Sequence, residues 1–216
     1  MKLLLLMPVF FLLITQRACS QADSRPKVKI GGGCEGCEAI YESPIPFNKL
    51  SWIDTLPDFN EPGPKMVISG IVLKRDGKTP AKDVVLYVYH TDQKGVYPNK
   101  GSETGWAKRH GYIRGWVKTN ENGEYKFYTL RPAAYPNANI PQHIHPTIKE
   151  PELDEYWIDE YLFDDDPYLT STERSRQEKR GGSGIIKLKE QNGMWYGERN
   201  IVLGLNVPNH PSALRK

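Results

Sequence analysis

From residue 66 onward, short β-type runs alternate with closely spaced turn signals, and this pattern limits the fold more than any other feature of the chain. Residues 84–90 show the alternation best, because Val85, Tyr87 and Tyr89 face one way and the residues between them face the other. Such runs predict an all-β fold whose core is an antiparallel β-sandwich. The expected strands cover residues 66–73, 84–90, 112–119, 124–128, 143–148, 156–163, 185–189 and 194–203.

Turn and cap residues add detail to this pattern. Asn-Gly pairs, the strongest short hairpin signal, stand at 122–123 and 192–193. We therefore expect the strands on either side of the first pair to form a hairpin. One short helix is expected over 172–180, where Thr170 can cap the N-terminus and Gly181 can end the helix.

The region before the strands has a different composition. Five prolines between residues 38 and 64 break any long element there, so we expect an irregular arm anchored by Trp52 and Phe59. The expected organisation is a leader over 1–20, an irregular N-terminal arm over 21–65, a β-sandwich domain over 66–207 and a tail over 208–216.

The first residues have the pattern of a secretory leader. Lys2 precedes an apolar run over 3–14 that is too short to span a bilayer, and no other stretch could span one. Ala18 and Ser20 are the small residues expected before a cut after Ser20. The alternative is a lipid anchor on Cys19, although the two residues before it match that signal poorly. Both interpretations predict an exported protein, secreted or periplasmic, and we favour soluble export.

Charge and cysteine usage narrow the classes of partner. The formal net charge of +3 falls to +1 without the leader, and no basic patch stands out, so nucleic acid is not an expected partner. Cys34 and Cys37 form an even pair that predicts a local disulfide in an oxidising compartment, with free or reactive thiols as the alternative. A zinc site would need two further ligands nearby.

The segment 135–145 carries the candidate chemistry. It ends in His143 and His145, whose side chains leave the same face of an extended strand. Tyr135 precedes the pair, and Tyr97 lies upstream. Phenolates are hard donors that suit Fe(III). Two tyrosinates would bring two negative charges to the 3+ ion and two neutral histidines none, so that one hydroxide would neutralise the site. Spacing alone does not bring the four together, and turn or core tyrosines remain the alternative.

The chain resembles the intradiol ring-cleavage dioxygenases over about residues 67–167. The resemblance rests on Leu-Tyr-Val-Tyr-His-Thr-Asp-Gln-Lys-Gly-Val-Tyr at 86–97, Arg-Gly-Trp-Val-Lys-Thr-Asn-Glu-Asn-Gly-Glu-Tyr-Lys-Phe at 114–127, Leu-Arg-Pro-Ala-Ala-Tyr-Pro at 130–136, His-Ile-His at 143–145 and Phe163 with Asp166-Pro167. It implies a β-sandwich that holds nonhaem Fe(III). The ligands would be Tyr97, Tyr135, His143 and His145, with Tyr135 and His145 axial and the other two equatorial.

The same resemblance implies an activity. A catechol-type aromatic would bind the iron through both oxygens, and the product of its reaction with O2 would be a muconate-type diacid. Tyr135 would leave the iron as a protonated phenol, so that Tyr135 and Tyr97 are the expected catalytic residues. No organic cofactor or reductant is needed. The segment 97–145 is closer to the protocatechuate type than to the catechol type, while the substrate and the oligomeric state are left open.

The sequence departs from the family pattern at two positions. Ile140 replaces an arginine that usually precedes the first histidine by three residues, and Glu160 replaces a glutamine found in some members. A charged donor of this kind is worth a few kcal/mol in a site that accumulates negative charge. Substitution of arginine for Ile140 is therefore expected to alter rate or substrate range without loss of iron. The candidate replacement cations are Arg131, Arg174 and Arg180.

Other interpretations stay beside this one. The chain also resembles non-catalytic β-sandwich modules of exported binding proteins, which gives a second hypothesis. A third hypothesis is an iron-binding relative with weak activity. A double His143→Ala/His145→Ala variant separates them, since a binding module would keep its function. We expect His90 and His110 to be structural or exposed and His210 to be solvated. The acidic run at 164–166 is read as a solvated turn rather than a calcium site.

Overall fold

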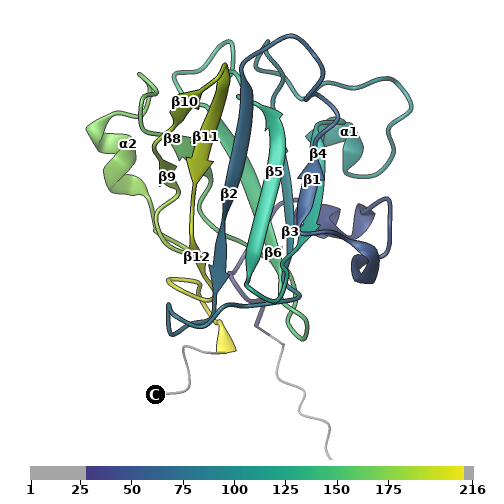
Figure 1. Cartoon of the computed structure of the whole chain (residues 1–216), viewed down its shortest axis with the longest axis vertical. Helices are drawn as coiled ribbons and strands as arrows, with labels where there is room; N and C mark the ends of the chain where they lie inside the picture. Colours follow the sequence, from purple (N-terminus) through teal and green to yellow (C-terminus); the bar gives the residue numbers. More distant parts are fainter. Residues whose placement is uncertain (1–27, 212–216) are drawn as a thin grey trace, which may run out of the picture.

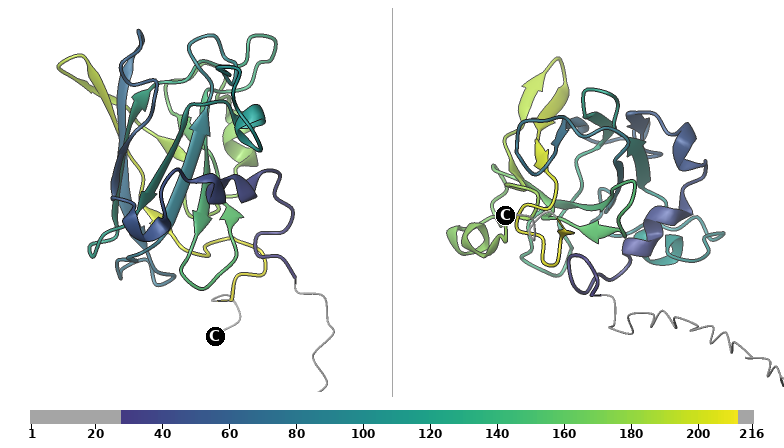
Figure 2. Two further views of the ribbon diagram at one scale, coloured as in Figure 1. Left: turned by 90° about the vertical axis from the view of Figure 1, so that its right-hand side faces the viewer. Right: turned by 90° about the horizontal axis from the view of Figure 1, so that it is seen from below.

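A computed structural model describes residues 28–211, which form two β-sheets packed face to face (Figures 1 and 2). The first sheet has the order β1-β5-β2-β11-β10 with β12 beside β2, and the second has the order β4-β3-β6-β8-β9 with β7 beside β6. The predicted all-β sandwich is confirmed. The strands are β1 Ile53–Thr55, β2 Lys65–Leu73, β3 Val85–His90, β4 Arg114–Lys118, β5 Glu124–Leu130, β6 His143–Lys149, β7 Tyr156–Trp157, β8 Tyr161–Phe163, β9 Ile185–Ile186, β10 Lys189–Gln191, β11 Met194–Glu198 and β12 Ile201–Val202.

The core lies between the two sheets. Leu86 and Val88 of β3 meet Ile68 of β2 and Phe127 of β5 there, and all four are at most 2 % exposed. Burial of each such side chain contributes about 1.5–3 kcal/mol. The alternation predicted for residues 84–90 is correct, because Val85 and Tyr87 pack on the opposite, outer face of the second sheet.

Strand direction is mixed rather than wholly antiparallel. The central pairs β2–β5, β3–β4 and β3–β6 are antiparallel, as expected. The pairs β1–β5, β11–β2 and β8–β9 are parallel, so the predicted antiparallel pairing is wrong for these strands. Each parallel pair joins segments that are distant in sequence, and side-chain periodicity carries no information about strand direction.

The two Asn-Gly turns behave differently. Asn192 and Gly193 both have positive φ, 52° and 77°, and they join β10 to β11 as an antiparallel hairpin. At the first pair only Gly123 has positive φ, and the carboxamide oxygen of Asn120 accepts the backbone N–H of Asn122. This turn carries the chain from β4 in the second sheet to β5 in the first. The hairpin predicted there is wrong.

Helix α2, Ser171–Arg176, confirms the predicted cap, because the Thr170 hydroxyl accepts the backbone N–H of Glu173 at 3.3 Å. The helix ends four residues earlier than expected. The Asp159 carboxylate accepts the backbone N–H groups of Lys179 and Arg180 at 2.7 and 3.0 Å, and it holds this segment outside the helix. Three further short helices were not predicted: η1 Cys37–Glu42, η2 Phe47–Lys49 and α1 Ala107–His110.

The described part of the N-terminal arm first packs on the outer face of the second sheet and then joins the first sheet as β1, beside β5 (Figure 2). It begins with a disulfide between Cys34 and Cys37, as predicted. Ile40 packs on the outer face, and its carbonyl accepts the indole N–H of Trp116 at 2.9 Å. Phe59 anchors the end of the arm by an edge contact with Tyr128, and the carbonyl of Trp52 accepts the backbone N–H of Lys126.

The two ends of the described chain lie together. The carbonyl of Pro208 accepts the backbone N–H of Gly31 at 2.8 Å, and His210 is buried with its Nε2 2.7 Å from Glu150. The prediction that His210 is solvated is wrong, because these contacts fold the start of the tail back onto the domain. Within residues 28–211, no helix is long and apolar enough to cross a membrane. The predicted leader and Cys19 lie outside the described residues.

Candidate metal centre on the outer face of the second sheet

Strand β6 presents the two histidines of the His-Ile-His segment on one face. Ile144 points into the core, so His143 and His145 emerge on the outer face, as the period of a strand requires. The register pairs His145 with Tyr89 of β3, and the two rings stack with centroids 4.5 Å apart. This packing covers one face of the His145 ring.

Two loops bring the tyrosines to the histidines. The loop ending at Tyr97 is closed by Asp92, whose carboxylate accepts the backbone N–H of Val96 at 3.1 Å. Gly95 has φ 76°, and a Cβ atom there would lie 2.0 Å from the carbonyl oxygen of Ala134 in the loop that carries Tyr135. Only glycine allows the two loops to approach so closely.

The donor atoms of all four predicted ligands converge. The hydroxyl oxygens of Tyr97 and Tyr135 are 2.5 Å apart, and the Tyr97 oxygen is 2.8 Å from Nε2 of His145. Nε2 of His143 is 3.2 Å from the Tyr135 hydroxyl. Residues far apart in sequence are therefore assembled into one cluster of two phenols and two imidazoles.

Burial favours the uncharged form of three of these side chains. Burial raises the pKa of both Tyr97 and Tyr135, and it lowers the pKa of His143. Neutral imidazole is the form that binds metal, whereas the phenols would have to lose their protons to a strongly polarising ion. The donor set therefore fits a highly charged, hard cation such as Fe(III).

The outer nitrogen of each histidine has a different acceptor. Nδ1 of His143 donates to the carbonyl of Pro141 at 2.7 Å, while Nδ1 of His145 lies 2.9 Å from a carboxylate oxygen of Glu160. Burial raises the pKa of Glu160, but the hydrogen bond from His145 and the electrostatic influence of both histidines outweigh burial, so the pKa of Glu160 is lowered. Both contacts leave Nε2 directed at the tyrosines.

Two cavities adjoin the cluster. The smaller, about 180 Å³, opens onto Tyr97, Tyr135 and His145 and is walled by Tyr89 and Trp106. The larger, about 460 Å³, touches only His145 of the four residues and extends over Glu160 toward the disulfide loop. We assign access to the smaller cavity, because three of the four donor side chains line it.

Arg109 of α1 is a cavity residue that sequence reasoning missed. Its guanidinium pairs with Glu35 of the disulfide loop, and it is the single lysine or arginine among the described residues that line the smaller cavity. The basic run of residues 108–110 was the available signal, but it belongs to no motif. The predicted replacement cations lie elsewhere and are paired: Arg131 with Asp165, Arg174 with Asp164 and Arg180 with Glu178. Ile140 is 44 % exposed and lines neither cavity.

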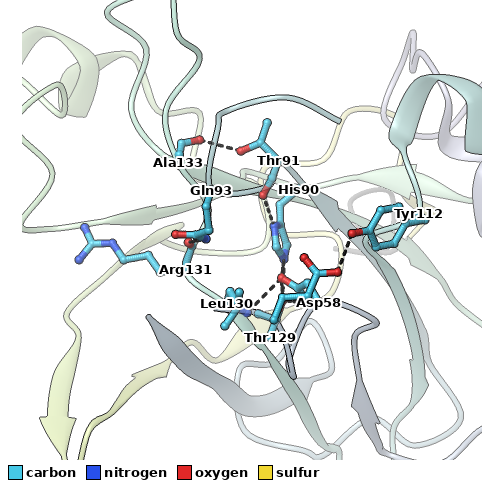
Figure 3. A network of polar contacts seen from close by, with 10 residues as sticks. Asp58, His90, Thr91, Gln93, Tyr112, Thr129, Leu130, Arg131 and Ala133 are labelled. Atoms are coloured by element: carbon cyan, nitrogen blue, oxygen red, sulfur yellow. Dashed lines mark hydrogen bonds and ion pairs between the residues drawn. The ribbon is translucent and has the colours of Figure 1, made fainter. Parts of the chain in front are cut away.

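The inner face of the same sheet holds a second polar cluster (Figure 3). His90 is fully buried; its Nδ1 lies 2.8 Å from the carbonyl of Thr91, and its Nε2 lies 2.7 Å from the Thr129 hydroxyl. That hydroxyl is also 3.0 Å from the carboxylate of Asp58. Satisfying every contact requires one proton on either the Asp58 carboxylate or Nε2 of His90, because the Thr129 hydroxyl can donate to only one of them.

The inner cluster also braces the tyrosine loops. The hydroxyl of Thr91, next to His90, donates to the carbonyl of Ala133 at 2.6 Å, and the backbone N–H of Ala133 donates to the backbone carbonyl of Asp92 at 3.2 Å. These bonds fix the loops of Tyr97 and Tyr135 to the end of β3. His90 and His110 were expected to be structural or exposed, and both are buried. His90 is held within the inner cluster, and His110 contacts Tyr87 and also lines the smaller cavity.

Comparison with known proteins relates the chain to dioxygenases. A family model described as Dioxygenase matches residues 48–177. Catechol 1,2-dioxygenase 1 of Acinetobacter lwoffii is 31 % identical over 160 residues, covering 63 % of this chain and 50 % of the relative. The protocatechuate 3,4-dioxygenase beta chain of Burkholderia cepacia is 28 % identical over 113 residues, covering 50 % of this chain and 48 % of the relative.

Solved structures agree at the level of the fold. A dioxygenase domain from a dioxygenase–carbohydrate-binding fusion of Streptomyces sp. SirexAA-E matches with TM-score 0.52 at 22 % identity, covering 67 % of this chain and 82 % of that one. Catechol 1,2-dioxygenase from Acinetobacter sp. ADP1, with mercury bound, matches with TM-score 0.53 at 18 % identity, covering 70 % and 56 %. The chain spans about half the length of the curated relatives it matches.

Proposed function

The chain belongs to the intradiol dioxygenase family, and we propose that it is a ferric enzyme that opens the ring of a catechol-type aromatic with O2 to give a muconate-type diacid. The observation that carries the proposal is the convergence of Tyr97, Tyr135, His143 and His145 beside a cavity. Two phenols and two imidazoles are a donor set suited to Fe(III). Membership of the family supports the reaction type.

The roles of the residues follow from their positions. A bound ferric ion supplies chelation and Lewis-acid polarisation of the catechol oxygens. The Tyr135 hydroxyl lies at the cavity beside Tyr97, and burial favours its protonated form, so Tyr135 is placed to hold a proton released by the incoming catechol. The aromatic walls, Tyr89 and Trp106, are suited to pack against the substrate ring and exclude water.

The reaction is tested with purified, ferric-loaded protein and 18O2. Catechol, protocatechuate and caffeate are compared side by side for O2 uptake, and the products are analysed by mass spectrometry. We expect a muconate-type diacid that carries both labelled oxygen atoms. If the protein binds iron but consumes no O2 with catechol, protocatechuate or caffeate, the enzyme assignment is contradicted. That result would favour an iron-binding relative without activity on these three compounds.

We further propose that the protein is exported. The leader-like first 20 residues support this, as does the disulfide between Cys34 and Cys37, because disulfides persist mainly in oxidising compartments. The enzyme would then meet its catechols outside the cytoplasm. Mass spectrometry of the protein from the natural host gives the mature N-terminus. A soluble chain beginning at Gln21 is the expected result, and an intact Met1 in the cytoplasmic fraction would contradict export.

A further inference from the structure

We propose that Glu160 is a positioning residue for His145, fixing the ring with Nε2 toward the tyrosines and adding a negative charge that favours a ferric over a ferrous ion. The inference rests on the proposed function and concerns the position where the resemblance gives a glutamine in some members. Nδ1 of His145 lies 2.9 Å from Oε1 of Glu160, which is a hydrogen bond with a charged acceptor.

The strand register of the second sheet places Glu160 and His145 side by side. Strands β6 and β8 are antiparallel, with His143 opposite Leu162 and Ile144 opposite Tyr161. Continuing that register by one residue places Glu160 beside His145, and cross-strand neighbours share a face of the sheet. Tyr89 stands on the other side of His145 in the same row.

The row fixes the His145 ring from three directions. The Tyr89 ring stacks on its face at 4.5 Å, the Glu160 carboxylate takes Nδ1–H, and the Tyr97 hydroxyl lies 2.8 Å from Nε2. A flip of the ring would lose both polar contacts. The tautomer with the proton on Nδ1 is therefore the one that satisfies Glu160 and leaves the Nε2 lone pair for a metal.

His143 provides an internal comparison. Its Nδ1 donates to the Pro141 carbonyl, which is a neutral acceptor, whereas His145 donates to a carboxylate. A carboxylate partner makes the histidine a stronger donor to the metal than a carbonyl does. Among the described residues, no lysine or arginine forms an ion pair with Glu160 that would neutralise its charge. We therefore expect Glu160 to act on the metal chiefly through its hydrogen bond with His145.

The test compares Glu160→Gln, Glu160→Ala and a control, Glu198→Gln. Glutamine keeps the size of the side chain and an acceptor oxygen but removes the charge, whereas alanine removes both. Glu198 lies exposed on β11 in the opposite sheet, so its substitution removes the same charge away from the site. The first measurement is the tautomer of His145 in the metal-free protein, by 15N NMR of the histidine ring.

We expect Nδ1–H alone in the wild type and in Glu160→Gln, and a mixture of tautomers in Glu160→Ala. The second measurement is the reduction potential of the iron-loaded proteins. For Glu160→Gln we expect the ratio of ferric to ferrous affinity to fall about tenfold, which corresponds to a potential about 59 mV higher. Glu198→Gln should match the wild type.

Two results would overturn the inference. One is a mixed tautomer in the wild type, and the other is a potential for Glu160→Gln equal to that of the wild type. Failure of the wild type to take up iron is a different outcome. It would contradict the proposed function and the proposed effect of the Glu160 charge on the iron. The NMR measurement on the metal-free protein would still decide whether Glu160 fixes the His145 ring.

Discussion

The two faces of the second sheet carry histidines with opposite surroundings. On the inner face, His90 is enclosed by Thr91, Thr129 and Asp58, and all its hydrogen-bonding positions are filled by the protein. On the outer face, His145 directs Nε2 at two phenols beside a cavity. Both nitrogens of each ring contact protein atoms, so filled hydrogen bonds alone do not separate the two histidines. The difference teaches that the convergence of several donors on one accessible point is what indicates a ligand site.

The largest expected effect comes from removing the outer cluster. His143→Ala/His145→Ala should lose bound iron and reduce ring cleavage at least about 1,000-fold, because half of the donor set disappears. Iron content and O2 uptake measure this effect, and urea unfolding of the metal-free protein should change little. A double variant that retains both iron and activity would break the distinction between the faces.

The pH dependence of the free energy of unfolding tests a further histidine of the outer face, His110, which stacks on Tyr89. Burial lowers the pKa of His110 from 6.5 to about 4, so the unfolded chain takes up a proton between these pH values that the folded chain excludes. The free energy of unfolding should therefore fall as the pH decreases through this window, by up to about 3 kcal/mol. In His110→Gln this contribution to the pH dependence should vanish.

Urea unfolding of both proteins at several pH values isolates the contribution of His110, since the other titrating groups, including Asp58 and His90, are common to both. Equal losses of stability in the wild type and in His110→Gln would show that the His110 ring is not held in its neutral form by burial.

Removal of one hydroxyl tests the inner face. Thr129→Val should destabilise the protein by about 2 kcal/mol, because Asp58 and His90 lose the group that links them. Iron stoichiometry should be unchanged. Thr147→Val is the matched control on the outer face, where the hydroxyl's one hydrogen-bond partner among residues 28–211 is the sulfur atom of Cys37 at 3.9 Å. Denaturant midpoints compare the two variants, and equal destabilisation would contradict the assigned role of Thr129.

The smallest effect concerns the cavity mouth. Arg109→Gln should raise KM for a carboxylated catechol about fivefold, a loss of about 1 kcal/mol, and leave KM for catechol unchanged. Glu35→Gln should act in the opposite direction, since it releases the guanidinium from its partner. Steady-state kinetics on protocatechuate and catechol measure both changes. Equal shifts on the two substrates would mean that Arg109 does not contact the carboxylate.

The sequence predicted periodicity and residue types better than connectivity. The inward and outward faces of β3 follow from alternation, and the cap at Thr170 follows from local hydrogen bonding. The wrong hairpin at Asn122 shows the limit of such signals. The turn was identified correctly, but its docking against β2, where Gly123 accepts the backbone N–H of Val72, is a tertiary contact that local sequence does not encode.

The candidate site shows the same division. The four donor residues were predicted from ordered motifs, and the structure brings them together. The surrounding residues were not predicted in their roles. Arg109 reaches the cavity from a four-residue helix, and Glu160 reaches His145 through strand register. Both placements depend on packing between segments distant in sequence, which no local motif predicts. The structure also places Ile140 outside both cavities, which reduces the effect expected for the substitution to arginine.

The most direct test of the central claim is the visible absorption spectrum of the purified mature protein, with iron quantified on the same sample. Iron bound at Tyr97 and Tyr135 should give a broad red-brown band from tyrosinate-to-iron charge transfer, at about one iron per chain. Addition of a catechol without oxygen should shift the band, and air should then consume the substrate. A protein that stays colourless after ferric loading would contradict the account.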